Sequence, residues 1–291
     1  MYQNQKKNYL LYFAVFLFIS VALLFYFDWQ NSHRKFTFAM LDVGQGDALF
    51  IESPSGKQIL IDAGPNKKVL SELSKVMSPF DRSLDAIIIT NPDADHIEGF
   101  LDILKNYKVG TVFESGTVSD SKTYESLENK IRDKKISDVL LKKGMRLNLG
   151  SGVALDVLFP DRDVSSWDTN YGSIVARLSY GNTSVMLTGD APAEIEKIIL
   201  AENNSDNLKS MILKVAHHGS KYSSSREFLK AVAPKYSFIS VGKNNKYNHP
   251  NQETLDVLSE FNTQILRTDL DGTIILKCDK IDVCKINKLK N

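Results

Sequence analysis

The N-terminal stretch of the chain is almost uniformly apolar. From Tyr9 to Phe27 it carries no charged residue, and Ser20 is its one polar interruption. About 20 apolar residues are enough to cross a bilayer as a helix. A cleaved signal peptide is the main alternative, but bulky residues follow the run instead of a small-residue cleavage site. The pattern therefore predicts a tail and a single transmembrane anchor over residues 1–29, with a polar linker over residues 30–35.

The charges around this anchor bear on its orientation. Lys6 and Lys7 lie directly before it, and the positive-inside rule then favours a cytoplasmic tail and an extracytoplasmic domain. Cys278 and Cys284 are close enough in sequence for two paired strands to bring them together, although the sequence leaves open whether they are bridged. A disulfide would agree with an oxidising compartment. We expect a single-pass protein of the cell membrane with its large domain outside the cytoplasm.

Residues 36–291 alternate between strand and helix patterns and form one predicted domain. Strands separated by Gly, Pro and Ser turns come first, as in hairpins, and strands interleaved with helices follow. This alternation predicts a mixed α/β layered fold. We predict strands at residues 36–43, 48–53, 58–64, 84–90, 109–115, 146–160, 173–181, 183–190, 210–220, 236–242, 264–269 and 272–277. We predict helices at residues 69–77, 97–107, 123–135, 193–202, 226–235 and 251–261.

Composition limits the classes of partner. The chain has 291 residues, of which 43% are hydrophobic and 24% charged, as in an ordinary globular protein with a sizeable core. Its formal net charge of +1 excludes strong steering toward nucleic acid by the protein as a whole, although a local basic face is compatible with it.

Side chains of metal-binding types follow several predicted strands. Asp95 and His96 come just after the apolar run 84–90. Later strands are followed by Asp190, His217, His218 and His249, so that four of the five histidines lie at strand ends. For the first group alone, an Asn-Pro-Asp turn with a helix-capping aspartate is an alternative explanation. Four histidines gathered beside terminal aspartates are better explained by one metal-binding mouth.

The order of these motifs resembles that of a known family. The matching pieces are LDVGQGDALFIESPSGKQILIDAG, IIITNPDADHIEGF, SIVARLSYGNTSVMLTGD, LKVAHHGS, NHP and RTDLDGTIIL. Together they resemble metallo-β-lactamase-fold hydrolases of the ComEC-type subfamily, the soluble domain associated with bacterial DNA-uptake (competence) proteins. The resemblance runs from about Phe36 to Leu276. It implies an αββα sandwich with metals bound in loops at one edge, here preceded by the predicted transmembrane helix.

The resemblance also implies a set of metal ligands. By position, the family's first metal motif falls on Asp93, Asp95 and His96, its bridging aspartate on Asp190, and its distal ligand on one of His217 and His218. We expect one or two divalent ions, with Mn²⁺ or Zn²⁺ favoured and Mg²⁺ as a third candidate. No nucleotide cofactor is expected.

Further residues are expected to support this site. His249 falls on a histidine near the mouth, as a partner for a substrate phosphate or for proton transfer. Together with Asp93 or Asp95, which would orient or deprotonate the attacking water, it forms the expected catalytic group. A glycine-rich loop facing the same edge carries Asp42, Gln45 and Asp47. Asp62 is either an orienter of a metal ligand or an ordinary aspartate in a strand-end turn.

One position departs from the family pattern. The first motif normally begins with a histidine after the threonine, and this chain has Asn91 there. An amide oxygen is an acceptable ligand for hard cations but a poor substitute for imidazole toward zinc. Asn91 is therefore a candidate ligand of a weakened or single-metal site, of a site tuned toward Mn²⁺ or Mg²⁺, or of a retained fold that has lost catalysis.

The expected function follows from the resemblance. It is metal-dependent hydrolysis of a phosphodiester, most readily single-stranded DNA, in a competence-like context with a separate membrane channel as partner. A small-molecule hydrolase acting on an ester, thioester or lactam is one alternative, because a fold does not fix its substrate. A catalytically silent module that binds DNA or a protein is another. Metal content and a phosphodiester assay distinguish the three.

Basic residues surround the later histidines in sequence. Between Lys214 and Lys246 they include Lys221, Arg226 and Lys243, which would steer a phosphate backbone, and of these Lys221 and Lys243 are the expected substrate contacts. An ordinary solvated surface is an equally good explanation of the same residues.

Overall fold

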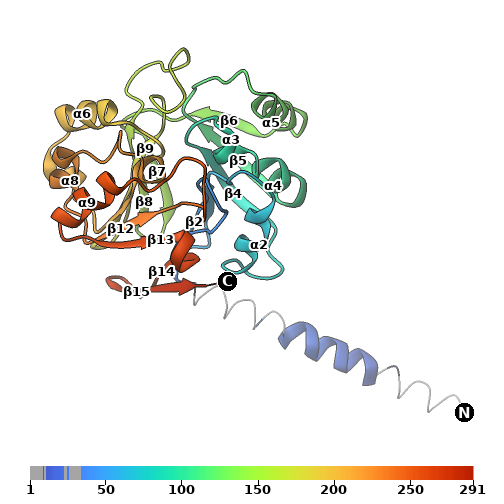
Figure 1. Ribbon diagram of the computed structural model, residues 1–291. Coiled ribbons are helices and arrows are strands. Elements are labelled where there is room, and N and C mark those ends of the chain that lie inside the picture. The colour runs from blue at the N-terminus through green and yellow to red at the C-terminus, as the bar shows by residue number, and fades with distance from the viewer. Residues whose placement is uncertain (1–8, 10, 23–24, 26–33, 291) are drawn as a thin grey trace, which may run out of the picture.

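Alternate side chains of the first strand face two different layers of the domain. In β1 (Phe36–Met40), Phe38 faces the space between two sheets, whereas Ala39 faces the opposite side, because successive strand residues point to opposite faces. The structure is a computed structural model that describes residues 9, 11–22, 25 and 34–290. Two sheets pack face to face and helices cover both outer faces (Figure 1), so the predicted α/β sandwich is confirmed.

The first sheet contains both ends of the domain. Its order is β15–β14–β1–β2–β3–β4–β5–β6, and β3 to β6 run parallel. The strands are β2 (Leu49–Glu52), β3 (Gln58–Ile61), β4 (Ser83–Ile89), β5 (Lys108–Glu114), β6 (Ser137–Leu140), β14 (Thr273–Lys280) and β15 (Val283–Leu289).

The second sheet has the order β13–β12–β11–β10–β9–β8–β7, with β10 to β13 parallel. Its strands are β7 (Arg146–Gly150), β8 (Val153–Phe159), β9 (Val175–Tyr180), β10 (Thr183–Leu187), β11 (Ile212–Lys214), β12 (Tyr236–Ile239) and β13 (Gln264–Arg267). The two sheets meet through apolar side chains such as Phe38 and Phe238, whose ring centroids are 6.4 Å apart.

Each sheet has its own helices on the outside (Figure 1). The first sheet is covered by α2 (Lys68–Ser74), α3 (Ala94–Ile97), α4 (Phe100–Asn106) and α5 (Lys122–Asp133). On the second lie α6 (Ala193–Glu202), α7 (Ser205–Leu208), α8 (Arg226–Val232) and α9 (Gln252–Glu260). Two further four-residue turns, η1 (Ala216–Gly219) and α10 (Thr268–Asp271), follow β11 and β13.

Most predicted elements are found, with local differences. The helix predicted at residues 97–107 is divided into α3 and α4, which meet at Gly99, where a Cβ would lie 2.0 Å from the carbonyl oxygen of Ala63. Strand β6 was not predicted, because three of its four residues are exposed and its pattern is that of a sheet edge. At the C-terminal end β14 and β15 form a hairpin, and Cys278 and Cys284 are paired across it by a disulfide.

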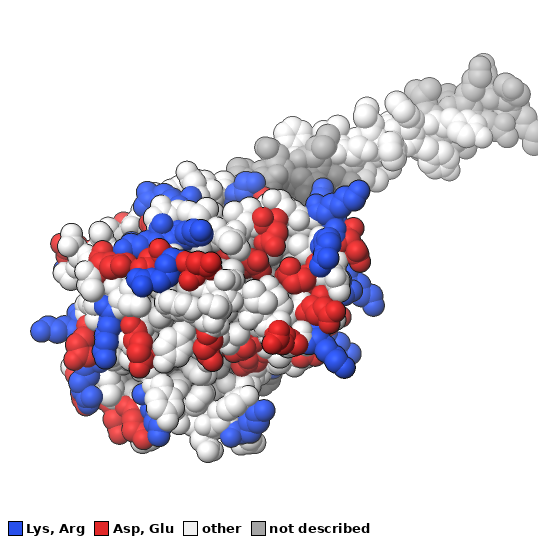
Figure 2. Space-filling view, turned by 90° about the horizontal axis from the view of Figure 1, so that it is seen from above, with Lys and Arg blue, Asp and Glu red and all other residues white. Residues whose placement is uncertain are grey.

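The predicted anchor falls partly outside the described residues. Residues 9, 11–22 and 25 are helical. No helix within the described ranges is both long enough and apolar enough to span a bilayer. On the domain face shown in Figure 2, basic and acidic side chains are interspersed, in keeping with the small net charge.

Strand direction defines two opposite edges of the domain. Because β1 is antiparallel to β2 and β2 to β3, β1 runs parallel to β3 and β4. The loops that follow β1, β3 and β4 therefore lie at one edge, and the domain begins at Phe36 on the other.

Candidate metal centre

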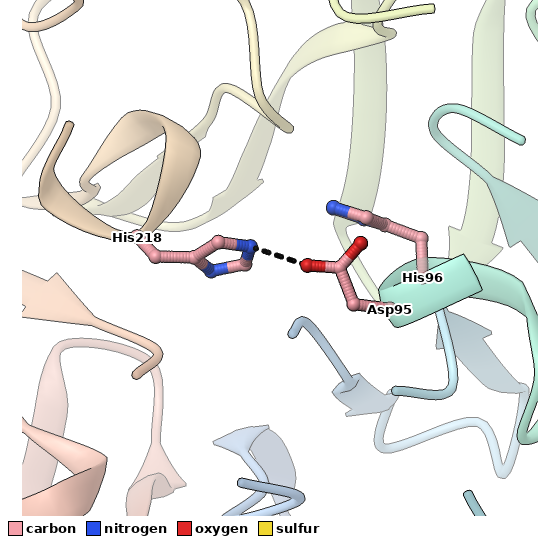
Figure 3. A group of neighbouring side chains, drawn as sticks. All are labelled: Asp95, His96 and His218. Carbon is pink, nitrogen blue, oxygen red and sulfur yellow. Dashed lines mark ion pairs between the residues drawn. The ribbon is translucent and has the colours of Figure 1, made fainter. Parts of the chain in front are cut away.

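The loops after β1, β4, β10 and β11 bring the predicted ligands together. Asp95 and His96 lie on α3, and His218 reaches them from η1 on the other sheet (Figure 3). His218 Nε2 is 3.4 Å from Asp95 Oδ2 and 3.5 Å from Asp190 Oδ2. His96 Nε2 lies 3.1 Å from the same Asp190 oxygen. Residues from both halves of the sandwich thus converge on one point.

Asp62 holds the ring of His96 at its Nδ1 atom, on the side away from the other candidate ligands. Its Nδ1 lies 2.8 Å from Asp62 Oδ2, and Asp62 accepts hydrogen bonds from the backbone N–H of Thr90 at 2.8 Å and from its hydroxyl at 2.6 Å. A carboxylate bound to one ring nitrogen directs the other nitrogen toward a metal. Burial by itself lowers the pKa of His96, but the carboxylates of Asp190 and Asp62 outweigh it and raise this pKa well above its usual value.

His218 and His217 occupy different positions. His218 is buried, and its Nδ1 lies 2.9 Å from the carbonyl oxygen of Ser240, which leaves Nε2 facing the carboxylates. His217 is partly exposed at the mouth, with Nε2 3.9 Å from Asp190 Oδ2. Of the two candidates for the distal ligand, His218 has the geometry of a ligand and His217 that of a residue lining the entrance.

The backbone is strained where these residues are presented. Asp62, His217 and His218 have φ values of 56°, 49° and 55°. Non-glycine residues rarely adopt this left-handed region, and such strain concentrates at functional sites.

The glycine-rich loop after β1 closes against the first motif. A Cβ on Gly46, whose φ is +127°, would lie 2.1 Å from the carbonyl oxygen of Asp95, so only glycine permits this approach. Asp47 is buried, with Oδ1 3.5 Å from His218 Nδ1. Gln45 Oε1 accepts a hydrogen bond from the backbone of Gly242 at 3.2 Å. Asp42 lies to one side and pairs with Lys68 at 3.0 Å.

Lys214 is the main functional residue that sequence reasoning placed wrongly. Both explanations of the basic residues, phosphate steering and an ordinary solvated surface, place it at the surface, but it is fully buried in the centre. Its ammonium forms an ion pair with Asp47, donates to the carbonyl oxygen of Gly189 at 2.7 Å and lies 3.5 Å from Asp190 Oδ1. The available signal was its place inside the apolar run of β11, where a charged side chain needs a buried partner.

Neighbouring positively charged side chains determine the pKa of Asp190. Burial by itself raises the pKa of its carboxyl, but His218, His96 and Lys214 hold this pKa well below its usual range. Asp190 is therefore an anion over the neutral pH range and available as a ligand.

Asn91 is buried and engaged with the protein at both ends of its amide. Its Oδ1 accepts from the backbone N–H of Asp93 at 2.9 Å, and its Nδ2 donates to Ser173 Oγ at 3.3 Å. Asp93 lies beside the convergent ligands. Burial raises the pKa of Asp93. The first-motif residues therefore divide into a pair that faces the centre, Asp95 and His96, and a pair that flanks it.

His249 lies at the mouth. Its ring centroid is 5.5 Å from that of His217, and Tyr247 stacks on it at 5.7 Å. Burial, together with the charges of His217 and His218, lowers the pKa of His249 to about 4, so the ring is neutral at pH 7. Its Nδ1 is buried and has no hydrogen-bond partner among the described residues.

The two predicted substrate lysines lie in separate pockets. Lys221 lines a pocket of about 520 Å³ together with His217, Tyr171 and Tyr222, and its ammonium is 5.5 Å from the centroid of the Tyr222 ring. Lys243 lines a different pocket of about 360 Å³ that also contains Asp42, Lys68 and Lys290.

The convergent residues fit a divalent cation. Asp95, His96 and His218 each offer one ligand atom, and these atoms lie within 4.8 Å of one another. His96 Nε2 and His218 Nε2 are buried and, within the part of the chain that the structure describes, neither has a hydrogen-bond partner. Buried polar atoms are rarely left unpaired, and two imidazoles with carboxylates suit Mn²⁺ or Zn²⁺. An ion bound here would replace the protons that the carboxylates hold on the histidines.

Comparison with known proteins gives the same picture. A family model described as the metallo-beta-lactamase superfamily matches residues 41–243. ComE operon protein 3 of Bacillus subtilis (strain 168) is 36% identical over 254 residues, covering 81% of this chain and 32% of that protein. Competence protein ComA of Neisseria gonorrhoeae is 27% identical over 235 residues, covering 80% and 31%. The chain spans about a third of the length of these relatives.

Two further similarities are more limited. Exodeoxyribonuclease WalJ of Streptococcus pneumoniae is 29% identical over 98 residues, 34% of each chain. The solved structure of Tm1679, described as a metal-dependent hydrolase of the beta-lactamase superfamily, matches with a TM-score of 0.54 at 14% identity, covering 86% of this chain and 100% of that one. The second similarity is one of fold.

Proposed function

Because the chain belongs to the metallo-beta-lactamase superfamily, we propose that it is a metal-dependent phosphodiesterase that cleaves single-stranded DNA outside the cell membrane. One observation carries the hydrolase part of this proposal. Two buried imidazole nitrogens, His96 Nε2 and His218 Nε2, face Asp95 and Asp190 while their Nδ1 atoms are held by the protein. Metallo-beta-lactamase folds are typical of metal-dependent hydrolases.

The residues divide the proposed chemistry among them. Asp95, His96, Asp190 and His218 would hold a divalent ion, and Asp93 and Asn91 flank these residues. Such an ion would supply Lewis acidity toward the phosphate and would promote the ionisation of water for hydrolysis. Asp93, whose pKa is raised by burial, receives the proton of the attacking water. Neutral His249 offers a ring nitrogen to the substrate at the mouth.

The surroundings of the mouth support a single-stranded nucleic acid as substrate. Two exposed tyrosines, Tyr222 and Tyr247, lie near His217 and His249, and each has a lysine ammonium over its ring, at 5.5 Å for Lys221 and 4.9 Å for Lys246. Aromatic rings stack on unpaired bases, and ammonium groups pair with the backbone phosphates. The name of one relative, an exodeoxyribonuclease, agrees with DNA as the substrate.

We further propose that the domain is held at the outer face of the membrane by the predicted anchor and acts beside a separate competence-type channel. The described residues of the apolar segment support the anchor, since side chains such as Phe16 and Phe18 are 68% and 74% exposed and suit a lipid environment. The disulfide between Cys278 and Cys284 supports an oxidising compartment.

The test uses the 291-residue chain in detergent with 5′-labelled single-stranded DNA and Mn²⁺, Mg²⁺ or Zn²⁺, beside an Asp190→Ala variant. We expect cleavage that requires metal and is lost in the variant. Metal binding with hydrolysis of an ester, thioester or lactam but not of DNA would establish a small-molecule hydrolase. Metal binding without any hydrolysis would establish the silent module, which the engaged amide of Asn91 favours.

A further inference from the structure

A second group of carboxylates lies outside the metal centre. Glu114 ends β5, Glu128 lies on α5, and Asp138 lies on β6. Each offers one oxygen, and these oxygens lie within 4.8 Å of one another. None of the three belongs to the first centre. They lie on the last two strands of the first sheet and on the helix that covers these strands (Figure 1).

Two of these carboxylates have no partner. Glu114 is largely buried, with 9% of the residue exposed, and no residue that the structure describes gives its carboxylate a hydrogen bond or an ion pair. Glu128 Oε1 is also buried without a hydrogen-bond partner in the described chain. The nearby guanidinium of Arg132 donates instead to Asn129 Oδ1 at 3.1 Å.

Such an arrangement is costly unless a positive charge enters it. Desolvated carboxylates at this distance repel one another, and each needs a proton or a cation. Burial, together with the charges of Asp138 and Glu128, raises the pKa of Glu114 to about 8. The group therefore holds a proton at neutral pH or exchanges it for a cation.

We propose that Glu114, Glu128 and Asp138 bind a hard divalent cation, with Ca²⁺ as the best fit. The donor set consists of oxygen alone, which selects against Zn²⁺ and is the set that Ca²⁺ prefers. Asp138 is exposed, so water can complete the coordination shell from the solvent side, and Ca²⁺ tolerates such an irregular geometry.

The cation has a structural role in this position. Strand β6 is at the edge of the sheet, pairs with β5 and has mostly exposed side chains, so few apolar contacts hold it. One ion bound to β5, α5 and β6 ties the edge strand and its covering helix to the interior of the sheet.

Tyr124 provides an internal probe of this site. It lies on α5, and the charges of Glu114, Glu128 and Asp138 reach its phenol, adding to the effect of burial in raising its pKa. The 291-residue chain is titrated with Tb³⁺ under tyrosine excitation, and the bound Tb³⁺ is then displaced with Ca²⁺. We expect Tb³⁺ emission that is sensitised by tyrosine and is lost when Ca²⁺ is added. In Glu114→Gln, the Ca²⁺ concentration needed to displace Tb³⁺ should be at least about tenfold higher.

Matched variants separate this site from the metal centre. Asp190→Ala, which removes a ligand of the metal centre, should keep the Ca²⁺-reversible emission, whereas Tyr124→Phe should lose it while Ca²⁺ binding by calorimetry persists. Ca²⁺ should also raise the thermal midpoint of the parent chain and of Asp190→Ala but not of Glu114→Gln. The half-buried Glu128→Gln gives the same result where Glu114→Gln fails to fold. Emission that survives both glutamine variants, or that disappears only with Asp190→Ala, would overturn the proposal.

Discussion

His96 and Asp62 form a fully buried pair in which the ring Nδ1 lies 2.8 Å from the carboxylate Oδ2. Asp62 is held in turn by the backbone and hydroxyl of Thr90. Rotation of the His96 ring breaks this chain of hydrogen bonds, so the direction of Nε2 is set by the fold before any ligand arrives. Asp62 and Thr90 therefore fix the orientation of His96 before a metal binds.

Asp62→Asn should weaken metal binding while leaving all direct ligands in place. An amide holds the ring less firmly and supplies no negative charge, and loss of such a partner typically costs about 10- to 100-fold in metal affinity. Calorimetric titration with Mn²⁺ measures the effect. Asp206→Asn, at a solvent-exposed position, is the matched control. Equal affinity in the two variants would show that Asp62 is only a turn residue.

His218→Ala and His217→Ala should have different effects. We expect His218→Ala to lose the ion, because its buried Nε2 faces Asp95 and Asp190. His217→Ala should keep the ion and lose hydrolytic rate, because His217 lines the mouth. Metal content after gel filtration, measured beside the rate of DNA cleavage, distinguishes them. Loss of the ion from His217→Ala alone would reverse the assignment.

Asn91→Ala should lower stability more than metal binding. It removes hydrogen bonds to the Asp93 backbone and to Ser173, which leaves buried groups unpaired at a cost of about 1–3 kcal/mol. Denaturant unfolding gives the stability, and Mn²⁺ titration of the same sample gives the affinity. A large loss of affinity with unchanged stability would make Asn91 a metal ligand.

Lys214→Met should destabilise the fold strongly. The change leaves the buried Asp47 carboxylate without its ammonium, and breaking a buried ion pair costs about 3–5 kcal/mol. The double variant Asp47→Asn/Lys214→Met should recover most of that loss in denaturant unfolding. A single variant as stable as the parent chain would mean that the pair is not formed.

Stability in the presence of a chelator should fall as pH rises from about 4.3 to about 8, and Glu114 should account for part of this fall. The folded chain keeps a proton on Glu114 across this window, whereas the unfolded chain has released it. The unfolded state therefore binds fewer protons, and the free energy of unfolding decreases with pH. Thermal midpoints across this range should be flatter for Glu114→Gln, and an identical slope would contradict the raised pKa.

Local sequence patterns were sufficient to predict the helices and strands whose residues share one kind of environment. Apart from the exposed Asp85, the run at residues 84–90 is buried as β4 and its extension, and the hairpin turn at Gly181 joins β9 to β10. Strand β6 escaped prediction because an exposed edge strand lacks the apolar alternation that marks a strand. The break between α3 and α4 depends on the close approach of Gly99 to Ala63, which residues far apart in the sequence determine.

The site was predictable in its residue types and only partly in its geometry. Strand ends predicted that His96, His217, His218 and His249 gather together, and their rings lie 5.5–6.1 Å from their neighbours. The sequence does not show which of His217 and His218 faces the metal ligands. The unusual backbone conformation of these two adjacent residues decides this, and that conformation is not apparent from the sequence. Nor does the sequence show that Lys214 lies inside, because a lysine reads as a surface residue until its carboxylate partners, distant in sequence, are placed.

The direction of β1 gives the domain a polarity. This strand of five residues spans about 17 Å, from Phe36 at one edge to the loop that carries Asp47 at the other. Under the anchoring proposed above, Phe36 is the described end of the domain nearest to the proposed anchor in sequence, and the candidate metal centre lies at the opposite edge. The length of β1 therefore separates the start of the domain from the entrance to that centre.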